Sequence, residues 1–415
     1  MFDQLEQCSA VSPPRVEVWN DVASLRAKER AWDDLWRRSG QVLPTARARP
    51  LAEWIDHFVA GSEFRAVVVR SGDELLAALP LVGARRLTCL PIGRLPRNDL
   101  SPAGDLLLDD RYDEASAINT LLDATRRLPW LWLEFDKFNP QTPRWKALLR
   151  ASQRNRMLRR LNRVARVGVV DLHQDWDEYL QTRSRNHRQQ MRKLLRRLER
   201  HGTVRLEVID NPSGDEIDER LQRGFEIEDR SWKGAAQTSV IRTPGALKFY
   251  LGQARVLSEL GHLRLVFLLV DDSPVAFEYG WVASGIYYSV KVAYDPQFAE
   301  MSPGQLLRWS YLQAWHDGGE VRGVDFCGPL TPATGRWISR SYSVADAIVV
   351  PVGMRGWLGR FIVDGGLMVR RLRSANTTAG DVSKKATCPS LPASDVENGA
   401  QPEATADEPA IAVTR

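Results

Sequence analysis

The chain has 415 residues, enough for two domains, and its hydrophobic fraction of 43% is that of an ordinary globular protein. The formal net charge of +5 suits acidic ligands such as nucleotides, and it equally suits a plain basic surface. The four cysteines contain no CxxC pair and no apolar run reaches the roughly 18 residues of a spanning helix, which argues against a zinc ribbon, a disulfide framework and a transmembrane segment.

The first half of the chain predicts a domain of mixed α/β type. Residues 1–15 predict a flexible N-terminus and lack the basic and apolar regions of a signal peptide, so we expect a cytoplasmic protein. Residues 16–150 predict the N-terminal domain, with an antiparallel hairpin. Its predicted elements are, in chain order, a strand at 16–19, a helix before residue 40, a helix at 51–60, hairpin strands at 64–70 and 75–82, a loop at 93–104, a helix at 112–127 and a strand at 131–135.

The second half, residues 151–350, repeats this order of elements, which predicts two domains of one fold in tandem. Arginine and leucine at helical spacing predict a helix over 142–166. The later predicted elements are strands at 167–172, 204–209, 264–270, 274–283, 286–294, 323–327 and 345–350, with helices at 183–201 and 302–317. Residues 351–373 predict a helical extension that docks on the body or touches a membrane surface, and the polar residues 374–415 predict a disordered tail.

One stretch, residues 286–307, joins a strand, a short loop and the start of a helix. Ser302 is a suitable N-cap and Pro303 a suitable first helical residue. The first N–H groups of a helix have no partner inside it and its dipole favours negative charge, so the loop predicts an anion site. Gly304 lets a phosphate approach the backbone closely. The alternative is an ordinary capped helix after a strand.

The predicted helix at 183–201 is strongly basic. Between Arg183 and Arg200 it has eight Lys or Arg against a single acid, Glu199, and an apolar stripe that begins at Met191. Its charged face is either simply solvated or the contact surface of an anionic cofactor or polymer. Because no aromatic residues stand among the charges, the helix argues against a stacking groove for nucleic acid.

Five segments in a fixed order carry a family resemblance. They are SRNHRQQMRKLLRRLE at 184–199, VAF at 275–277, AYDP at 293–296, SPGQLL at 302–307 and VDFCG at 324–328. With them the chain resembles GNAT-superfamily acyltransferases of the BioF2-like type, which include proteins associated with bacterial cellulose and exopolysaccharide synthesis and are similar to Fem-type aminoacyl transferases. The resemblance implies an α/β (α+β) fold of two tandem GNAT-like domains, each a mixed, largely antiparallel sheet flanked by helices.

The resemblance also implies that the second domain binds acyl-CoA, in the simplest case acetyl-CoA. The strand before Tyr294 would part from its neighbour, the pantetheine would lie in the gap, and the diphosphate would rest on the helix N-terminus. The cofactor contacts implied in this way are Val292, Ala293, Tyr294, Ser302, Pro303, Gly304 and Gln305. Relatives often carry a basic pair before a tryptophan. In this chain the position of that basic pair, just before Trp337, is taken by Arg336. Arg336 would contact an anion in place of the relatives' lysine, but a guanidinium cannot act as a base.

Acyl transfer needs a base for the nucleophile and an acid for the leaving thiolate. Glu278 is the first candidate base, because burial among aromatic residues in mid-strand would raise its pKa; the alternative is a carboxylate in a salt bridge, with Lys291 as partner. Asp325, at a strand end beside the gap, is the second candidate base or positions the acceptor, unless it merely caps a loop. Tyr294 is the candidate acid, unless it only packs. We expect the substrate to contact Lys291, Arg336 and Trp337.

Three functions therefore fit the sequence. The first is an acyl-CoA-dependent N- or O-acyltransferase with a small-molecule or glycan acceptor, in exopolysaccharide or cell-envelope metabolism. The second is a Fem-type aminoacyl transferase that uses charged transfer RNA, and the third is a non-catalytic accessory protein of polysaccharide synthesis. The six histidines are dispersed without metal-ligand spacing, so no metal is expected.

Overall fold

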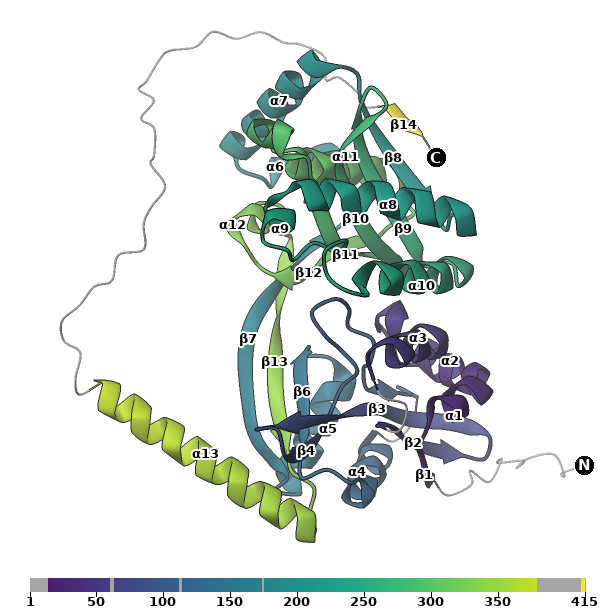
Figure 1. Ribbon diagram of the computed structural model, residues 1–415, viewed down its shortest axis with the longest axis vertical. Helices are drawn as coiled ribbons and strands as arrows, with labels where there is room; N and C mark the ends of the chain where they lie inside the picture. The colour runs from purple at the N-terminus through teal and green to yellow at the C-terminus, as the bar shows by residue number, and fades with distance from the viewer. Residues whose placement is uncertain (1–13, 60–62, 112–113, 174, 379–411, 415) are drawn as a thin grey trace, which may run out of the picture.

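The computed structural model describes residues 14–59, 63–111, 114–173, 175–378 and 412–414, which form two lobes stacked along the long axis (Figure 1). The strands are β1 (Arg15–Trp19), β2 (Phe64–Ser71), β3 (Glu74–Arg86), β4 (Leu90–Arg94), β5 (Leu107–Leu108), β6 (Leu133–Phe138), β7 (Leu158–Asp171), β8 (Val204–Asp210), β9 (Leu263–Val270), β10 (Ser273–Ala283), β11 (Ile286–Tyr294), β12 (Gly323–Pro329), β13 (Arg340–Val349) and β14 (Ala412–Thr414). The helices are α1 (Val22–Ala27), α2 (Glu29–Arg38), α3 (Ala48–Phe58), α4 (Glu114–Ala124), α5 (Pro143–Arg154), α6 (Trp176–Gln181), α7 (Arg185–Leu198), α8 (Gly214–Arg230), α9 (Trp232–Ala235), α10 (Ala246–Glu259), α11 (Pro303–Gly318), α12 (Pro332–Gly335) and α13 (Met354–Thr378). Short 3₁₀ turns add η1 (Pro44–Ala46), η2 (Thr125–Arg127), η3 (Glu199–His201) and η4 (Pro296–Met301).

The two lobes repeat one strand arrangement within a single sheet. The sheet order is β1-β2-β3-β4-β6-β13-β7-β12-β11-β10-β9-β8-β14, with β5 beside β3. From one end, β1 to β4 are antiparallel neighbours and β6 is parallel to β4. From the other, β8 to β11 are antiparallel neighbours and β12 is parallel to β11. The predicted fold class, a tandem mixed α/β fold with largely antiparallel sheets flanked by helices, is confirmed.

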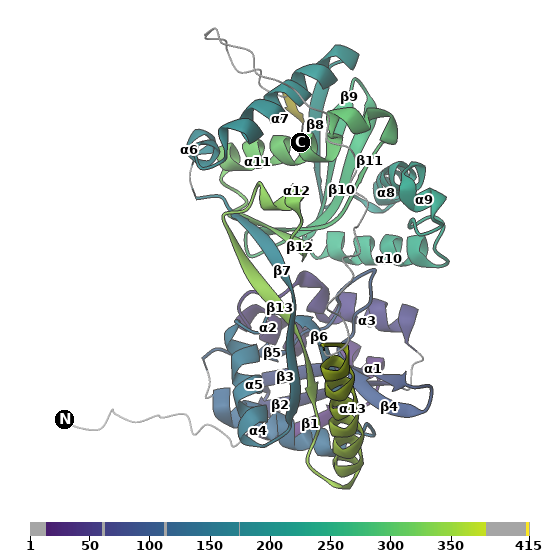
Figure 2. The same cartoon turned by 90° about the vertical axis from the view of Figure 1, so that its left-hand side faces the viewer.

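Two long strands, β7 and β13, cross between the lobes (Figure 2). They pair with each other from Arg340 opposite Val169 to Val349 opposite Leu158. β7 carries the chain out of the first lobe and ends beside β12 of the second, whereas β13 returns and ends beside β6 of the first. The predicted domain boundary at residues 150 and 151 lies inside α5, and β13, on the far side of that boundary, completes the sheet of the first lobe.

The hydrophobic core is also shared. One cluster includes Trp32 and Trp54 of the first lobe together with Phe225, Tyr250 and Trp281 of the second, all buried. Separate clusters fill the opposite faces of the sheet, one under α4 and α5 and one under α6, α7 and α11. Burial of apolar surface between the lobes therefore fixes their relative position.

Most of the predicted elements are present, and one prediction is wrong. The helix predicted over 142–166 ends at Arg154, and the chain continues as β7 from Leu158. Arg159, Arg160, Arg163 and Arg166 keep a near-helical spacing, but they lie on a partly exposed stretch of strand that pairs with β13, so the long-range pairing decides the structure here. The basic helix is α7, with its apolar stripe buried, and Gly202 after it has a positive φ of 150°.

The predicted extension at 351–373 is α13, which continues to Thr378. Of the predicted flexible N-terminus, residues 1–13 lie outside the described residues, and β1 already begins at Arg15. Most of the predicted tail, 379–411 and residue 415, is also outside them. Among the described helices, none combines the length and the apolar character that crossing a bilayer requires.

Candidate functional site

The parallel strands β11 and β12 part from each other in the middle of the second lobe. They pair only where Ile286 to Tyr288 lie opposite Gly323 to Asp325. Beyond this point β11 continues to Tyr294 alongside β10 alone, and β12 turns toward β7, where Pro329 lies opposite Val167. The parting implied by the family resemblance is therefore present.

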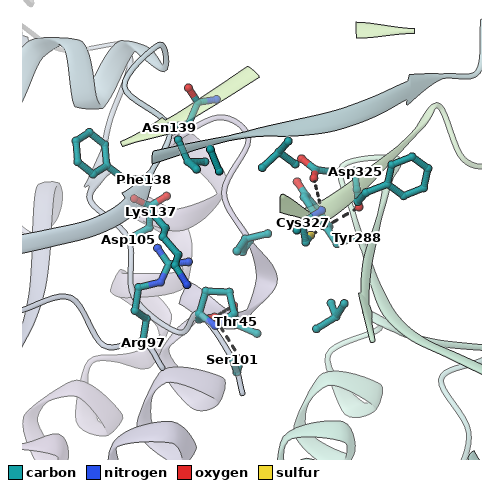
Figure 3. Close-up of a pocket in the computed structure, with 18 of the residues that line it drawn as sticks. Thr45, Arg97, Ser101, Asp105, Lys137, Phe138, Asn139, Tyr288, Asp325 and Cys327 are labelled. Carbon is teal, nitrogen blue, oxygen red and sulfur yellow. Dashed lines mark hydrogen bonds between the residues drawn. The ribbon is translucent and has the colours of Figure 1, made fainter. Parts of the chain in front are cut away.

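A cavity of about 830 Å³ lies between the lobes, and both parted strands line it. β11 contributes Tyr288 and residues 290–292, and β12 contributes residues 325–329. The first lobe contributes the loop 97–105 and the segment 137–144. Figure 3 shows Arg97, Ser101 and Asp105 of the first lobe facing Tyr288 and Asp325 of the second across this cavity. Because the strand parting opens into the cavity, a molecule held between the strands can meet a second one held between the lobes.

Asp325 lies at the point where the strands part, with its side chain 5% exposed. Its Oδ1 accepts a hydrogen bond of 2.8 Å from the backbone N–H of Cys327, and its Oδ2 accepts one of 2.9 Å from the Tyr342 hydroxyl. Cys327 has a positive φ of 53°, so the chain turns sharply enough for its N–H to reach back to the carboxylate. Burial raises the pKa of Asp325, and the two hydrogen bonds oppose that rise. Asp325 is therefore a buried carboxyl at the cavity wall whose orientation two hydrogen bonds fix.

Glu278 lies on the other face of the sheet. It is fully buried beneath α11 and does not line the cavity. The hydroxyls of Tyr287 and Tyr311 and the guanidinium of Arg308 surround it. Burial raises its pKa, as expected from the sequence, while Arg308 opposes the rise. The high pKa alone does not put this carboxylate within reach of a substrate in the cavity.

A β-bulge in β11 separates Lys291 from Glu278. Tyr279 lies opposite Lys291 whereas Gly280 lies opposite Ser289, so Val290 has no opposite residue on β10. Because side chains alternate between faces, the extra residue turns Lys291 to the face opposite to Ser289. The alternative interpretation of the sequence, in which Lys291 pairs with Glu278, is therefore wrong.

Lys291 instead pairs with Glu228 of α8. Its Nζ lies 3.5 Å from Glu228 Oε1, and Lys233 donates to the same oxygen at 2.7 Å. Both lysines line the cavity, and Glu228 itself is 1% exposed. Burial lowers the pKa of Lys291, and Glu228 opposes that change. Two ammonium groups sharing one carboxylate leave an excess positive charge at the cavity wall.

The start of α11 has the predicted residues but not the predicted cap. Ser302 is the N-cap and Pro303 the first helical residue, yet Ser302 has a positive φ of 50° and its hydroxyl makes no capping hydrogen bond. The N–H groups of Gln305 and Leu306 both donate to the Ser302 carbonyl, at 2.8 and 3.2 Å. A Cβ at Gly304 would lie 3.8 Å from the side chains of Tyr294 and Val292, an ordinary contact, so both side chains lie beside the start of α11.

The other predicted contacts lie apart from the cavity. Tyr294 is 40% exposed and lies beside the start of α11, and Ala293 is buried. Trp337 is fully buried, and its indole N–H donates to Gln305 Oε1 at 2.7 Å, so both side chains support the helix start. Arg336 is exposed and donates to Gln190 of α7 at 3.1 Å. The cavity thus contains Asp325, Lys291 and Val292 of the predicted residues.

Sequence reasoning missed three cavity residues that matter here: Tyr342, Lys233 and Gln41. Gln41 of the first lobe donates to the Tyr288 hydroxyl at 3.3 Å and so links the lobes at the cavity wall. These residues stand in segments without a recognisable motif, and only the long-range fold brings them to Asp325 and Lys291. No group of three or more His, Cys, Asp or Glu side chains suited to a metal ion occurs in the described part of the chain.

The comparisons with known proteins agree with this geometry. Residues 185–333 match the family described as the acetyltransferase (GNAT) domain. This part of the chain is similar to GNAT acetyltransferase domains. It runs from α7 to α12 and includes the whole parting of β11 and β12.

Solved structures share the fold at low sequence identity. FemX is 10% identical, with a TM-score of 0.53, over 81% of this chain and 98% of its own. A tandem GNAT protein from the clavulanic acid biosynthesis pathway is 13% identical, with a TM-score of 0.44, over 82% of this chain and 100% of its own. No protein of curated function matches the sequence. The likeness to FemX extends across both lobes and therefore concerns the whole tandem fold.

Proposed function

We propose that the chain transfers an acyl group, in the simplest case acetyl, from acyl-CoA to an amine or hydroxyl of an acceptor held between the lobes. The observation that carries the proposal is the parting of β11 and β12 into a cavity that contains the buried carboxyl of Asp325. The match of residues 185–333 to the GNAT acetyltransferase domain supports the same reaction class.

The donor fits the parted edge of β11. Within the described residues no strand pairs with this edge beyond Tyr288, so its backbone groups are free to bond the amides of a pantetheine arm. Gly304 puts no side chain of its own at the start of α11, where the helix dipole favours negative charge. A second cavity of about 460 Å³, lined by Arg197, Arg200 and η4, lies just ahead of this helix. Arg197 pairs there with Glu300 at 3.0 Å, so positive charge for the nucleotide end comes chiefly from Arg200.

Asp325 is the base in this proposal. It takes the proton from the acceptor amine or hydroxyl as the acceptor forms its bond to the acyl carbon and the bond to sulfur breaks. The hydrogen bonds from Cys327 and Tyr342 fix the carboxylate in one orientation while burial keeps its pKa high enough to accept a proton. Glu278 we assign a supporting role beneath α11. Tyr294, beside the start of α11, is placed to contact the donor and stays a candidate acid for the thiolate.

The acceptor carries an anionic group in this proposal. Lys233 and Lys291 share Glu228 and present their excess charge to the cavity, which favours a carboxylate or phosphate on the acceptor. Charged small molecules and glycans of exopolysaccharide or cell-envelope metabolism meet this requirement. Arg336 and Trp337, which lie outside the cavity, have no acceptor role here.

A second candidate is a Fem-type aminoacyl transferase that uses charged transfer RNA. The shared fold with FemX and the solvent-facing basic side of α7 favour it. In α7 the exposed basic residues are Arg185, Arg192, Lys193 and Arg196. A polyanion on this face would dissociate steeply with salt, whereas acyl-CoA in the strand gap would depend on salt much less.

One experiment separates these functions. The purified chain is heated with a series of acyl-CoAs and with aminoacyl-transfer RNA, and thiol release is then followed with amine and hydroxyl acceptors. We expect acetyl-CoA to raise the melting temperature and thiol release to depend on the acceptor. Stabilisation by charged transfer RNA alone would favour the second candidate, and acyl-CoA binding without any transfer would favour an accessory protein.

A further inference from the structure

α13 carries an apolar stripe on its outer side. Met354 is 93% exposed, and Trp357 and Phe361 are each 72% exposed. With Leu358, 46% exposed, they stand at positions i, i+3, i+4 and i+7, which is one face of a helix. Large aromatic side chains this exposed are rare on a soluble surface and, when grouped, mark a contact surface.

The opposite side of α13 is already packed on the first lobe. Val363 is buried in a cluster with Leu131 and Trp132. A Cβ at Gly359 would lie 2.3 Å from the carbonyl oxygen of Leu131, so only glycine permits this close approach of the helix to the body. Packing therefore fixes the rotation of the helix and directs the stripe outward.

Arginines accompany the stripe in the sequence of α13. Arg355 and Arg360 are exposed on the same helix, and the sequence continues with Arg370, Arg371 and Arg373. The single acid in residues 351–373 is Asp364, which lies 3.5 Å from Arg360. Figure 1 shows α13 starting at the bottom of the first lobe and running outward, so that its C-terminal end lies away from both lobes. The exposure of Met354, Trp357 and Phe361 leaves the stripe at the start of the helix open to a partner.

We propose that α13 binds the surface of a membrane that contains anionic lipids. Aromatic side chains on one side of a helix and arginines around them are the composition of helices that lie in the bilayer interface. Trp357 and Phe361 enter the headgroup boundary, and the arginines contact lipid phosphates. The charge favours this partner over a second copy of the chain, whose α13 would bring the same arginines together.

The test is co-sedimentation of the full chain with vesicles of phosphatidylcholine alone or mixed with phosphatidylglycerol. We expect binding to the anionic vesicles that weakens as salt rises. The double variant Trp357→Ala, Phe361→Ala should bind at least about tenfold more weakly, because it removes most of the apolar area. Leu87→Ala is the control for the loss of an exposed apolar side chain outside α13, since Leu87 is 81% exposed in the turn between β3 and β4.

Three outcomes would overturn the proposal. The first is the absence of binding to either vesicle, and the second is unchanged binding of the double variant. The third is a wild-type dimer in solution that the double variant converts to a monomer, which would assign the stripe to a second copy. Melting curves should be the same for the wild type and the double variant, because the two aromatic side chains contact solvent and not the core. A large drop in the variant would mean that the stripe covers another segment of the chain.

Discussion

The hydroxyl of Tyr342 donates a hydrogen bond of 2.9 Å to Oδ2 of Asp325. Tyr342 belongs to β13 and Asp325 to β12, two strands that do not pair with each other, because β7 runs between them. The bond therefore spans the middle strand at the point where the lobes meet. It ties the orientation of the proposed base to the strand that returns to the first lobe.

The hydrogen bond from Tyr342 should affect how kcat/KM depends on pH. Burial raises the pKa of Asp325 and the Tyr342 hydrogen bond lowers it, so Tyr342→Phe should raise the pKa further. A base works in its deprotonated form, and the acid limb of kcat/KM should therefore move to higher pH in the variant. Tyr288→Phe is the control, because the Tyr288 hydroxyl bonds to Gln41 and should leave the limb in place. An unshifted limb in Tyr342→Phe would argue against Asp325 as the titrating base.

Asp325→Asn and Glu278→Gln should impair different properties, the first the rate of transfer and the second the stability of the fold. We expect Asp325→Asn to lower the rate of transfer by about 10² or more with little change in acyl-CoA affinity. Glu278→Gln removes the buried carboxyl group near Arg308 and should destabilise the fold by about 1–3 kcal/mol, with a much smaller effect on turnover per folded molecule. Steady-state kinetics and denaturant unfolding of both variants measure the contrast. The reverse pattern would return the base role to Glu278.

Gly304→Asp should weaken acyl-CoA binding by about tenfold, because it places a carboxylate against the proposed diphosphate position. Gly304→Ala is the steric control. Its Cβ would meet Tyr294 and Val292 at 3.8 Å, an ordinary contact, so its affinity should stay near that of the wild type. Aspartate in the first turn of a helix does not harm folding. Calorimetry that gives equal affinities for all three proteins would place the diphosphate elsewhere.

Lys233→Met should change which acceptors are used. With one ammonium group removed, the remaining Lys291 is neutralised by Glu228 and the cavity wall loses its excess charge. We expect KM to rise about tenfold for acceptors with a carboxylate or phosphate and to stay unchanged for neutral ones. Comparing kcat/KM across acceptors of both kinds tests this. An equal loss for neutral and anionic acceptors would mean that Lys233 only supports the local fold.

Those parts of this structure that depend on neighbouring residues can be predicted from the sequence. Residues 286–307 predict β11, the loop and α11, because strand propensity, an N-cap position and a proline all act within a few residues. α7 follows from its apolar spacing in the same way. The parting of β11 and β12 follows from the family resemblance and not from any local pattern.

The remaining parts depend on contacts between distant residues. The bulge at Val290 has no marker in the sequence, and it reverses the face on which Lys291 lies. Glu278 is buried, as the sequence predicts. The sequence does not show that α11 covers the face of the sheet on which Glu278 lies, which leaves the cavity on the opposite face. Tyr342 reaches Asp325 because β13 runs beside β7, a pairing of residues far apart in the chain.

Because β7 leaves the first lobe and β13 returns to it, the two lobes cannot fold in simple chain order. During synthesis the first lobe emerges from the ribosome with β6 paired to β4 on one side only, because its other neighbour, β13, follows some 200 residues later. The open edge of β6 must wait until residues 340–349 have been translated before the sheet can close. An expression fragment that stops at residue 150 would keep this edge exposed, and we expect it to associate with itself rather than fold as an independent unit.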